Sequence, residues 1–149
     1  MIELSWAVEG PRPISDEQAL AALEAALEHG GRPGLDLSVV FVADEELTRL
    51  HAEHLDDPTP TDVITFDLGD DDDGPAGELY LSVERAREVA ESHGGTWASE
   101  LTLYLVHGAL HMCGYDDHEE EERRAMRRAE WTVMERLGYA LDAARHEDS

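Results

Sequence analysis

The sequence predicts an α+β fold in which about five helices pack on a small, four-stranded mixed sheet. Three observations carry this prediction. Four short segments are apolar, β-branched or alternating in polarity, as strands are. Longer segments with helical periodicity and capping residues interleave with them. Finally, no apolar run approaches the roughly 20 residues that are needed to span a bilayer, so the apolar segments must pack against one another.

The predicted strands are short and bounded by turn-forming residues. The first alternates in polarity and ends before the sequence EGPRP, and the second is rich in valine. The other two flank a charged, glycine-containing loop. In order they cover residues 2–8, 35–43, 63–66 and 77–82.

The predicted helices have recognisable ends. Ser15 precedes two acids and an Ala- and Leu-rich run that stops at Gly30, a typical N-cap and C-terminal pair. Asp44 is the predicted cap of the second helix. The helices are expected over residues 16–29, 45–55, 83–93, 99–112 and about 119–137. Residues 1–149 are therefore interpreted as a single domain with a loose tail from about residue 140.

Charge is the unusual bulk property of this chain. It contains 35 acidic and 11 basic residues, a formal charge of −24, and every basic residue is an arginine. Adaptation to a salty cytoplasm, where charge repulsion is screened, is one interpretation. A GC-rich genome, which favours arginine over lysine, is the other. The charge opposes easy binding of polyanions, and DNA is not an expected partner.

Cellular location is inferred from what the sequence lacks. The first residues, MIELSWAVEG, do not have the basic start and apolar middle of a signal peptide. Cys113 is the only cysteine, so no intramolecular disulfide can form, and a reducing compartment suits the chain. A cytoplasmic protein without a membrane partner is expected.

Two histidines four residues apart predict a metal site on a central helix. His107 and His111 lie in the otherwise apolar stretch ELTLYLVHGALHM, and this spacing places both imidazoles on one helical face. Gly114 fits the left-handed turn that ends a helix, and such a turn would bring Asp117 or His118 to the same ion. Two satisfied polar histidines are the alternative, although burying both imidazoles requires partners.

The neighbouring residues narrow the chemistry. Zinc suits such donors and can lower the pKa of water to about 7, while other divalent metals stay open. The residue after His107 is Gly108, so the HExxH motif of metalloproteases is absent.

Cys113 is expected to pack as a small apolar residue. Four arginines on the last helix are expected to pair with preceding glutamates at i,i+4, with phosphate contact as the alternative; they are Arg123, Arg124, Arg127 and Arg128.

These motifs resemble the YbeY family of metal-dependent endoribonucleases, or rRNA maturation factors. The family signature H-G-x-L-H-x-x-G-Y-D-H is similar to HGALHMCGYDD at residues 107–117, and the segment P-T-D-V-L-S-F is similar to PTDVITF at residues 60–66. GELYLSVERAREVAESHG and MRRAEWTVMERLGY resemble the family's strand-helix segment and closing helix. The resemblance covers nearly the whole chain.

The chain departs from the family pattern at two positions. The third histidine of the signature falls on Asp117, and His118 is one residue late. Asp117 is the expected third ligand, with His118 as the alternative. The family often has an arginine before the P-T-D-V segment, where this chain has Leu55. Arg49, Arg85 and Arg87 are the nearest arginines by sequence that could replace it.

The resemblance implies a zinc-dependent endoribonuclease of single-stranded RNA. The family acts in 16S rRNA 3′-end maturation and ribosome quality control, which implies an rRNA precursor as substrate and ribosomal small-subunit proteins as partners. His118 is a candidate proton carrier, because imidazole exchanges protons near neutral pH. Thr61 and Asp62 are candidates for shaping the cleft. The alternatives are a ribosome-associated assembly factor with a mainly structural metal, and a metallohydrolase of small esters or amides.

Overall fold

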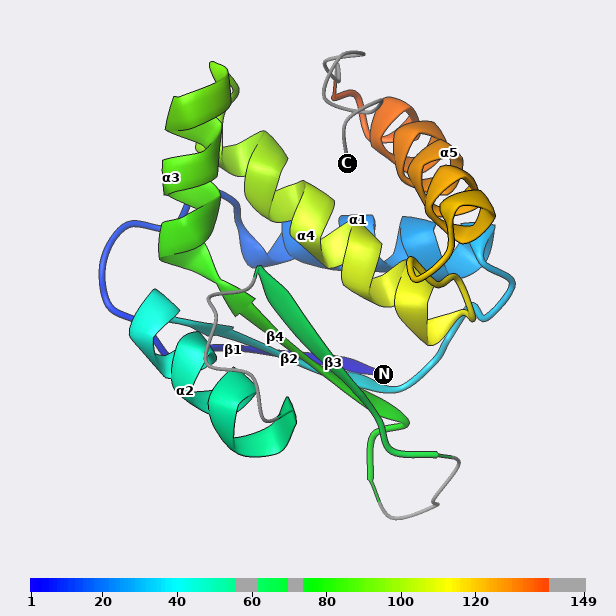
Figure 1. The fold of residues 1–149 in the computed structure, drawn as a ribbon, viewed down its shortest axis with the longest axis horizontal. Helices are drawn as coiled ribbons and strands as arrows, with labels where there is room; N and C mark the ends of the chain where they lie inside the picture. The colour runs from blue at the N-terminus through cyan, green and yellow to red at the C-terminus, as the bar shows by residue number, and fades with distance from the viewer. Residues whose placement is uncertain (56–61, 70–73, 140–149) are drawn as a thin grey trace.

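The computed structural model describes residues 1–55, 62–69 and 74–139. The predicted loop around residue 60, part of the loop after residue 69 and the predicted loose tail lie outside these ranges. Figure 1 shows the four strands and five helices of the described chain. The strands are β1 (Ile2–Trp6), β2 (Leu37–Val42), β3 (Val63–Asp67) and β4 (Gly77–Ser82). The helices are α1 (Asp16–His29), α2 (Asp44–Leu55), α3 (Val83–His93), α4 (Trp97–Met112) and α5 (Glu120–Arg136).

The sheet is mixed, as predicted. Its strand order is β1-β2-β4-β3. Strand β2 pairs in parallel with both β1 and β4, whereas β3 pairs antiparallel with β4. Helices α1, α3, α4 and α5 lie on one side of the sheet and α2 lies on the other (Figure 1). This arrangement confirms the α+β fold class.

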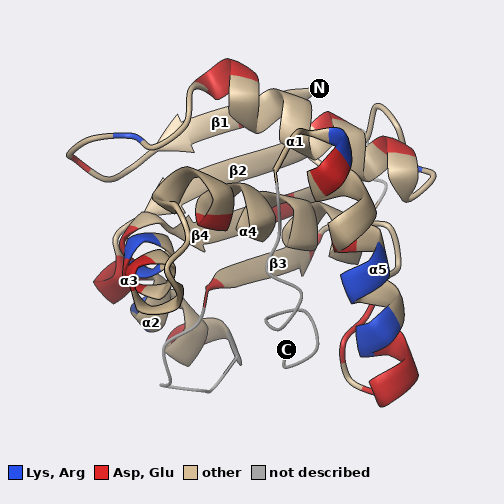
Figure 2. Cartoon of the chain, turned by 90° about the horizontal axis from the view of Figure 1, so that it is seen from above, with Lys and Arg blue, Asp and Glu red and all other residues tan. Residues whose placement is uncertain are grey.

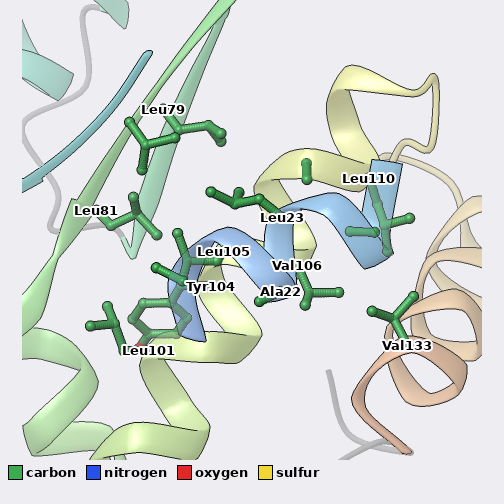
Figure 3. Packing of buried hydrophobic residues seen from close by; sticks show 14 of the residues in the cluster. Ala22, Leu23, Leu79, Leu81, Leu101, Tyr104, Leu105, Val106, Leu110 and Val133 are labelled. Carbon is green, nitrogen blue, oxygen red and sulfur yellow. The ribbon is translucent and has the colours of Figure 1, made fainter. Parts of the chain in front are cut away.

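Helix α4 is the centre of the helical layer. It contacts α1, α3 and α5 as well as strands β3 and β4. Because it is apolar around most of its circumference, burial on several sides is the stable solution. Figure 3 shows its residues Leu101, Leu105 and Leu110 packed among side chains of β4, α1 and α5. A smaller cluster lies under α2 and contains Val42, Leu47 and Ile64.

Gly108 allows α4 to lie directly on strand β4. A Cβ atom at this position would be 2.1 Å from Cδ2 of Leu79, a residue with no exposed surface, and 3.4 Å from Cγ2 of Val63. Glycine in a helix interior costs about 1 kcal/mol relative to alanine. Here that cost permits a close approach of helix and sheet, at the position immediately after His107.

Two helix starts differ from the prediction. Helix α4 begins at Trp97 and not at Ser99, because the Thr96 side chain caps it by accepting a hydrogen bond from the Ser99 backbone. Asp44 is the first residue of α2 and not its cap. Its carboxylate instead accepts hydrogen bonds from the Ser82 hydroxyl at 3.0 Å and from Arg85 at 3.1 Å. Within the described residues, none of the helices is both long enough and apolar enough to cross a membrane.

Candidate metal centre

The two histidines lie together on the C-terminal half of α4, with their ring planes nearly perpendicular, at 79°. The Nε2 atoms of His107 and His111 are 3.1 Å apart. Their side chains are 25% and 21% exposed, so the rings are anchored in the helical layer but reachable from solvent. The helix fixes this geometry, because residues four apart are neighbours on its surface.

A tight turn after α4 brings Asp117 back to the histidines. Gly114 has a φ of 99°, a conformation that side chains disfavour. The Tyr115 amide donates to the Leu110 carbonyl at 3.1 Å, which closes the turn. The Asp117 Oδ2 atom then lies 3.7 Å from Nε2 of His107 and 3.6 Å from Nε2 of His111.

These three donor atoms have the spacing of one face of a metal coordination sphere. Bonds of about 2.0–2.2 Å in a tetrahedral site place neighbouring donors roughly 3.3–3.6 Å apart. The separations of 3.1, 3.6 and 3.7 Å bracket that interval. Two imidazole nitrogens and one carboxylate oxygen are a set that suits zinc. Asp117 is 43% exposed, so the cluster opens to solvent on its carboxylate side.

His118 lies in a different position from Asp117. Its side chain is 81% exposed, and its Nε2 atom is 3.2 Å from Oδ1 of Asp116. His118 could share a metal ion with Asp116 and Asp117, whereas His107 and His111 of α4 could share one with Asp117. The geometry therefore favours Asp117 over His118 as the third donor, and ligation of a metal stays a prediction.

Glu130 is a site residue that the sequence interpretation missed. It lies on α5, its surface is only 8% exposed, and its Oε2 atom is 3.2 Å from Nδ1 of His107. A carboxylate at this position keeps the proton on Nδ1 and fixes the orientation of the ring. The lone pair of Nε2 then remains available on the side of His111 and Asp117. A signal was present: Glu130 occupies the apolar face of α5 that Met126 and Val133 define, and buried acids are rare without a partner.

The pKa values of the two histidines are shifted in opposite directions. Burial lowers the pKa of His107, but the hydrogen bond and charge of Glu130, with the charge of Asp117, outweigh it and raise that pKa above 6.5. Burial and the neighbouring charge of His107 lower the pKa of His111. Such a separation suits a pair that shares one proton when no ion is bound.

Replacing Glu130 with glutamine should reverse the shift at His107. The raised pKa means that this group adds stability below pH 6.5, and that the contribution is lost as pH rises through the folded pKa. NMR titration of the imidazoles in chelator should place the pKa of His107 above 6.5 in the wild type and below it in Glu130→Gln. The exposed Glu135 on the same helix provides the control Glu135→Gln, which should leave His107 unchanged. Equal values in all three proteins would contradict the assigned role.

The other residues considered from the sequence lie in several parts of the fold. Asp62 is exposed just before β3, and its charge also acts to raise the pKa of His107; Thr61 lies outside the described residues. Leu55 is the last residue of α2. The arginines considered as substitutes are engaged elsewhere: Arg49 with Glu46 and Glu53, Arg85 with Asp44, and Arg87 with Glu91. As predicted, Cys113 packs against the hydrophobic core.

The fold and the cluster define a small α+β protein with two histidines and a carboxylate at the end of its central helix. A family model described as Endoribonuclease YbeY matches residues 12–138. The chain therefore belongs to the endoribonuclease YbeY family, which confirms the resemblance seen in the sequence.

Individual relatives agree with this assignment. The chain is 37% identical over 118 residues to the endoribonuclease YbeY of Carboxydothermus hydrogenoformans, covering 78% of this chain and 82% of the relative. It is 36% identical over 138 residues to that of Bacillus licheniformis, covering 82% and 87%. The solution structure of TM1509 from Thermotoga maritima is 24% identical, covers 100% of this chain and 97% of its own, and has the same fold with a TM-score of 0.62.

Proposed function

We propose that this protein is a zinc-dependent endoribonuclease that hydrolyses single-stranded RNA. Membership of the endoribonuclease YbeY family supports the reaction class. The observation that carries the metal dependence is the triangle of donors from His107, His111 and Asp117, with sides of 3.1, 3.6 and 3.7 Å. An ion with three protein ligands keeps an open position for chemistry, as catalytic zinc sites do.

Each residue of the site has a distinct role in this proposal. His107, His111 and Asp117 would hold the ion, and Glu130 would keep the His107 ring oriented through its Nδ1 atom. Zinc would supply Lewis-acid polarisation of a phosphoryl oxygen and activation of water. His118 is proposed as a proton carrier, because its imidazole lies next to Asp117 in the chain and is open to solvent.

The proposed substrate is an rRNA precursor, processed at the 3′ end of 16S rRNA and during ribosome quality control. With a formal charge of −24, the protein repels a free polyanion at ordinary ionic strength. A salty cytoplasm or a ribosomal protein partner would reduce this repulsion, and both are compatible with a cytoplasmic site of action.

Chelation should abolish cleavage of an unstructured RNA, and added zinc should restore it. The assay compares purified protein with and without chelator, at moderate salt and in molar KCl, and follows circular dichroism in parallel. Cleavage is expected to fall to background while the helical signal persists. Undiminished cleavage in chelator would contradict metal dependence. Unfolding on chelation, in a protein that never cleaved RNA, would support the alternative of a structural metal.

A further inference from the structure

Positive charge in this acidic protein is concentrated on α5. The helix starts with glutamates and continues with arginines, and Figure 2 shows blue segments following the red start of α5. The arginines of this helix are Arg123, Arg124, Arg127, Arg128 and Arg136. Their partners differ, and the differences single out one of them.

The predicted i,i+4 pairing with glutamates holds for Arg124, which contacts Glu120 at 2.7 Å. It is wrong for Arg123, which donates to the backbone carbonyls of His118 at 3.0 Å and Asp117 at 3.5 Å. Arg127 is half-buried, yet within the described residues its side chain has no hydrogen bond or ion pair. The Arg128 side chain also has none there, but it is exposed and lines a small cavity with His29.

Arg127 lies on the face of α5 that is turned toward the metal centre. Two residues of this face contact the centre directly: Arg123 through the Asp117 carbonyl, and Glu130 through His107. At about 100° per residue, Arg123, Arg127 and Glu130 fall within a sector of roughly 60°. Arg127 lies at one edge of this sector, about 40° round the helix from Arg123, and along the helix axis it lies between the other two. Helical side chains lean toward the N-terminus, so Arg127 leans toward the Asp117 end. Arg128 is about 100° further round.

We propose that Arg127 binds a phosphate of the RNA strand beside the metal centre, an inference that rests on the proposed function. The chain has 35 acidic residues for 11 arginines, so a half-buried guanidinium that has no carboxylate partner in the described part of the chain is unexpected. Its planar fork of donors matches a phosphate group bidentately. Arg123 acts as a positioning residue, because its hydrogen bonds hold the segment that carries Asp117.

The salt dependence of RNA binding tests this role. A labelled single-stranded RNA is titrated with chelator-treated protein, which prevents cleavage, over a series of KCl concentrations. Losing one phosphate contact should reduce the slope of log K against log salt by about 0.7 for a single strand. Arg127→Gln should show this reduction and bind about tenfold more weakly. Arg127→Lys, which retains the charge, should keep the slope. Arg128→Gln removes the same charge from the next residue and should keep the wild-type slope.

The outcomes separate this inference from the proposed function. Equal slopes for Arg127→Gln and Arg128→Gln would overturn the phosphate contact, and so would loss of slope in Arg127→Lys. If the wild type shows chelator-sensitive cleavage but Arg127→Gln has the wild-type slope, only this inference fails. If the wild type neither binds nor cleaves single-stranded RNA, both fail. Thermal unfolding of each variant shows whether a weaker interaction reflects lost contact or lost structure.

Discussion

Replacing Asp117 with alanine should reduce zinc affinity by more than about 10–100-fold. That range is typical of losing a residue that only hydrogen-bonds to a metal ligand. The carboxylate supplies the only oxygen in the donor triangle, at 3.6 and 3.7 Å from the two imidazoles. Two histidines alone would hold the ion weakly, and RNA cleavage should fall with occupancy. Competition with a zinc indicator, together with metal analysis of the purified protein, measures the change.

His118→Ala is the matched control for this substitution. It removes a donor one residue further on, from a side chain that is 81% exposed and contacts Asp116. Zinc affinity should stay close to that of the wild type, while cleavage falls if the ring carries a proton. A larger loss of zinc from His118→Ala than from Asp117→Ala would overturn the assignment of the third ligand.

Gly108→Val should destabilise the protein by roughly 1–3 kcal/mol, the range for overpacking a well-packed core. The new side chain would meet Leu79 and Val63 of the sheet, and α4 would have to move away from β4. Because Gly108 directly follows His107, this movement should also weaken zinc binding. Urea unfolding of the chelated protein measures the loss of stability, and the indicator assay measures the loss of affinity.

Gly95→Val provides a control for the glycine itself. Gly95 is exposed between α3 and α4, and a Cβ atom there would have no neighbour within 4 Å. Its effect on stability should stay within about 0.5 kcal/mol, as at other surface positions. Equal stability of the two variants would show that α4 does not depend on close contact with β4.

Local rules explain what the sequence could predict. The four-residue spacing of His107 and His111 sets their geometry once the segment is helical. Gly114, which has a positive φ, predicted the turn that follows α4. The strands and helices were predicted with small errors at their ends, because capping and periodicity are local as well. The choice between Asp117 and His118 needed the path of the turn, which spacing alone leaves open.

Long-range packing explains what was missed. Glu130 meets His107 only because α5 lies against α4, and no local pattern states that contact. The preference for glutamate pairing along α5 failed for Arg123 for the same reason, since its acceptors lie in the segment that precedes the helix. The exact approach of α4 to Leu79 likewise appears only when the sheet is assembled.

All three donors come from one short stretch between residues 107 and 117, folded back by the turn at Gly114. A cross-link stabilises a protein most when it closes a long loop, because it then removes the most freedom from the unfolded chain. An ion at this site would tie together residues that are already neighbours along the backbone. Its contribution to stability would therefore depend on the affinity of the site and on the concentration of the ion. The strands of the sheet would be ordered without it.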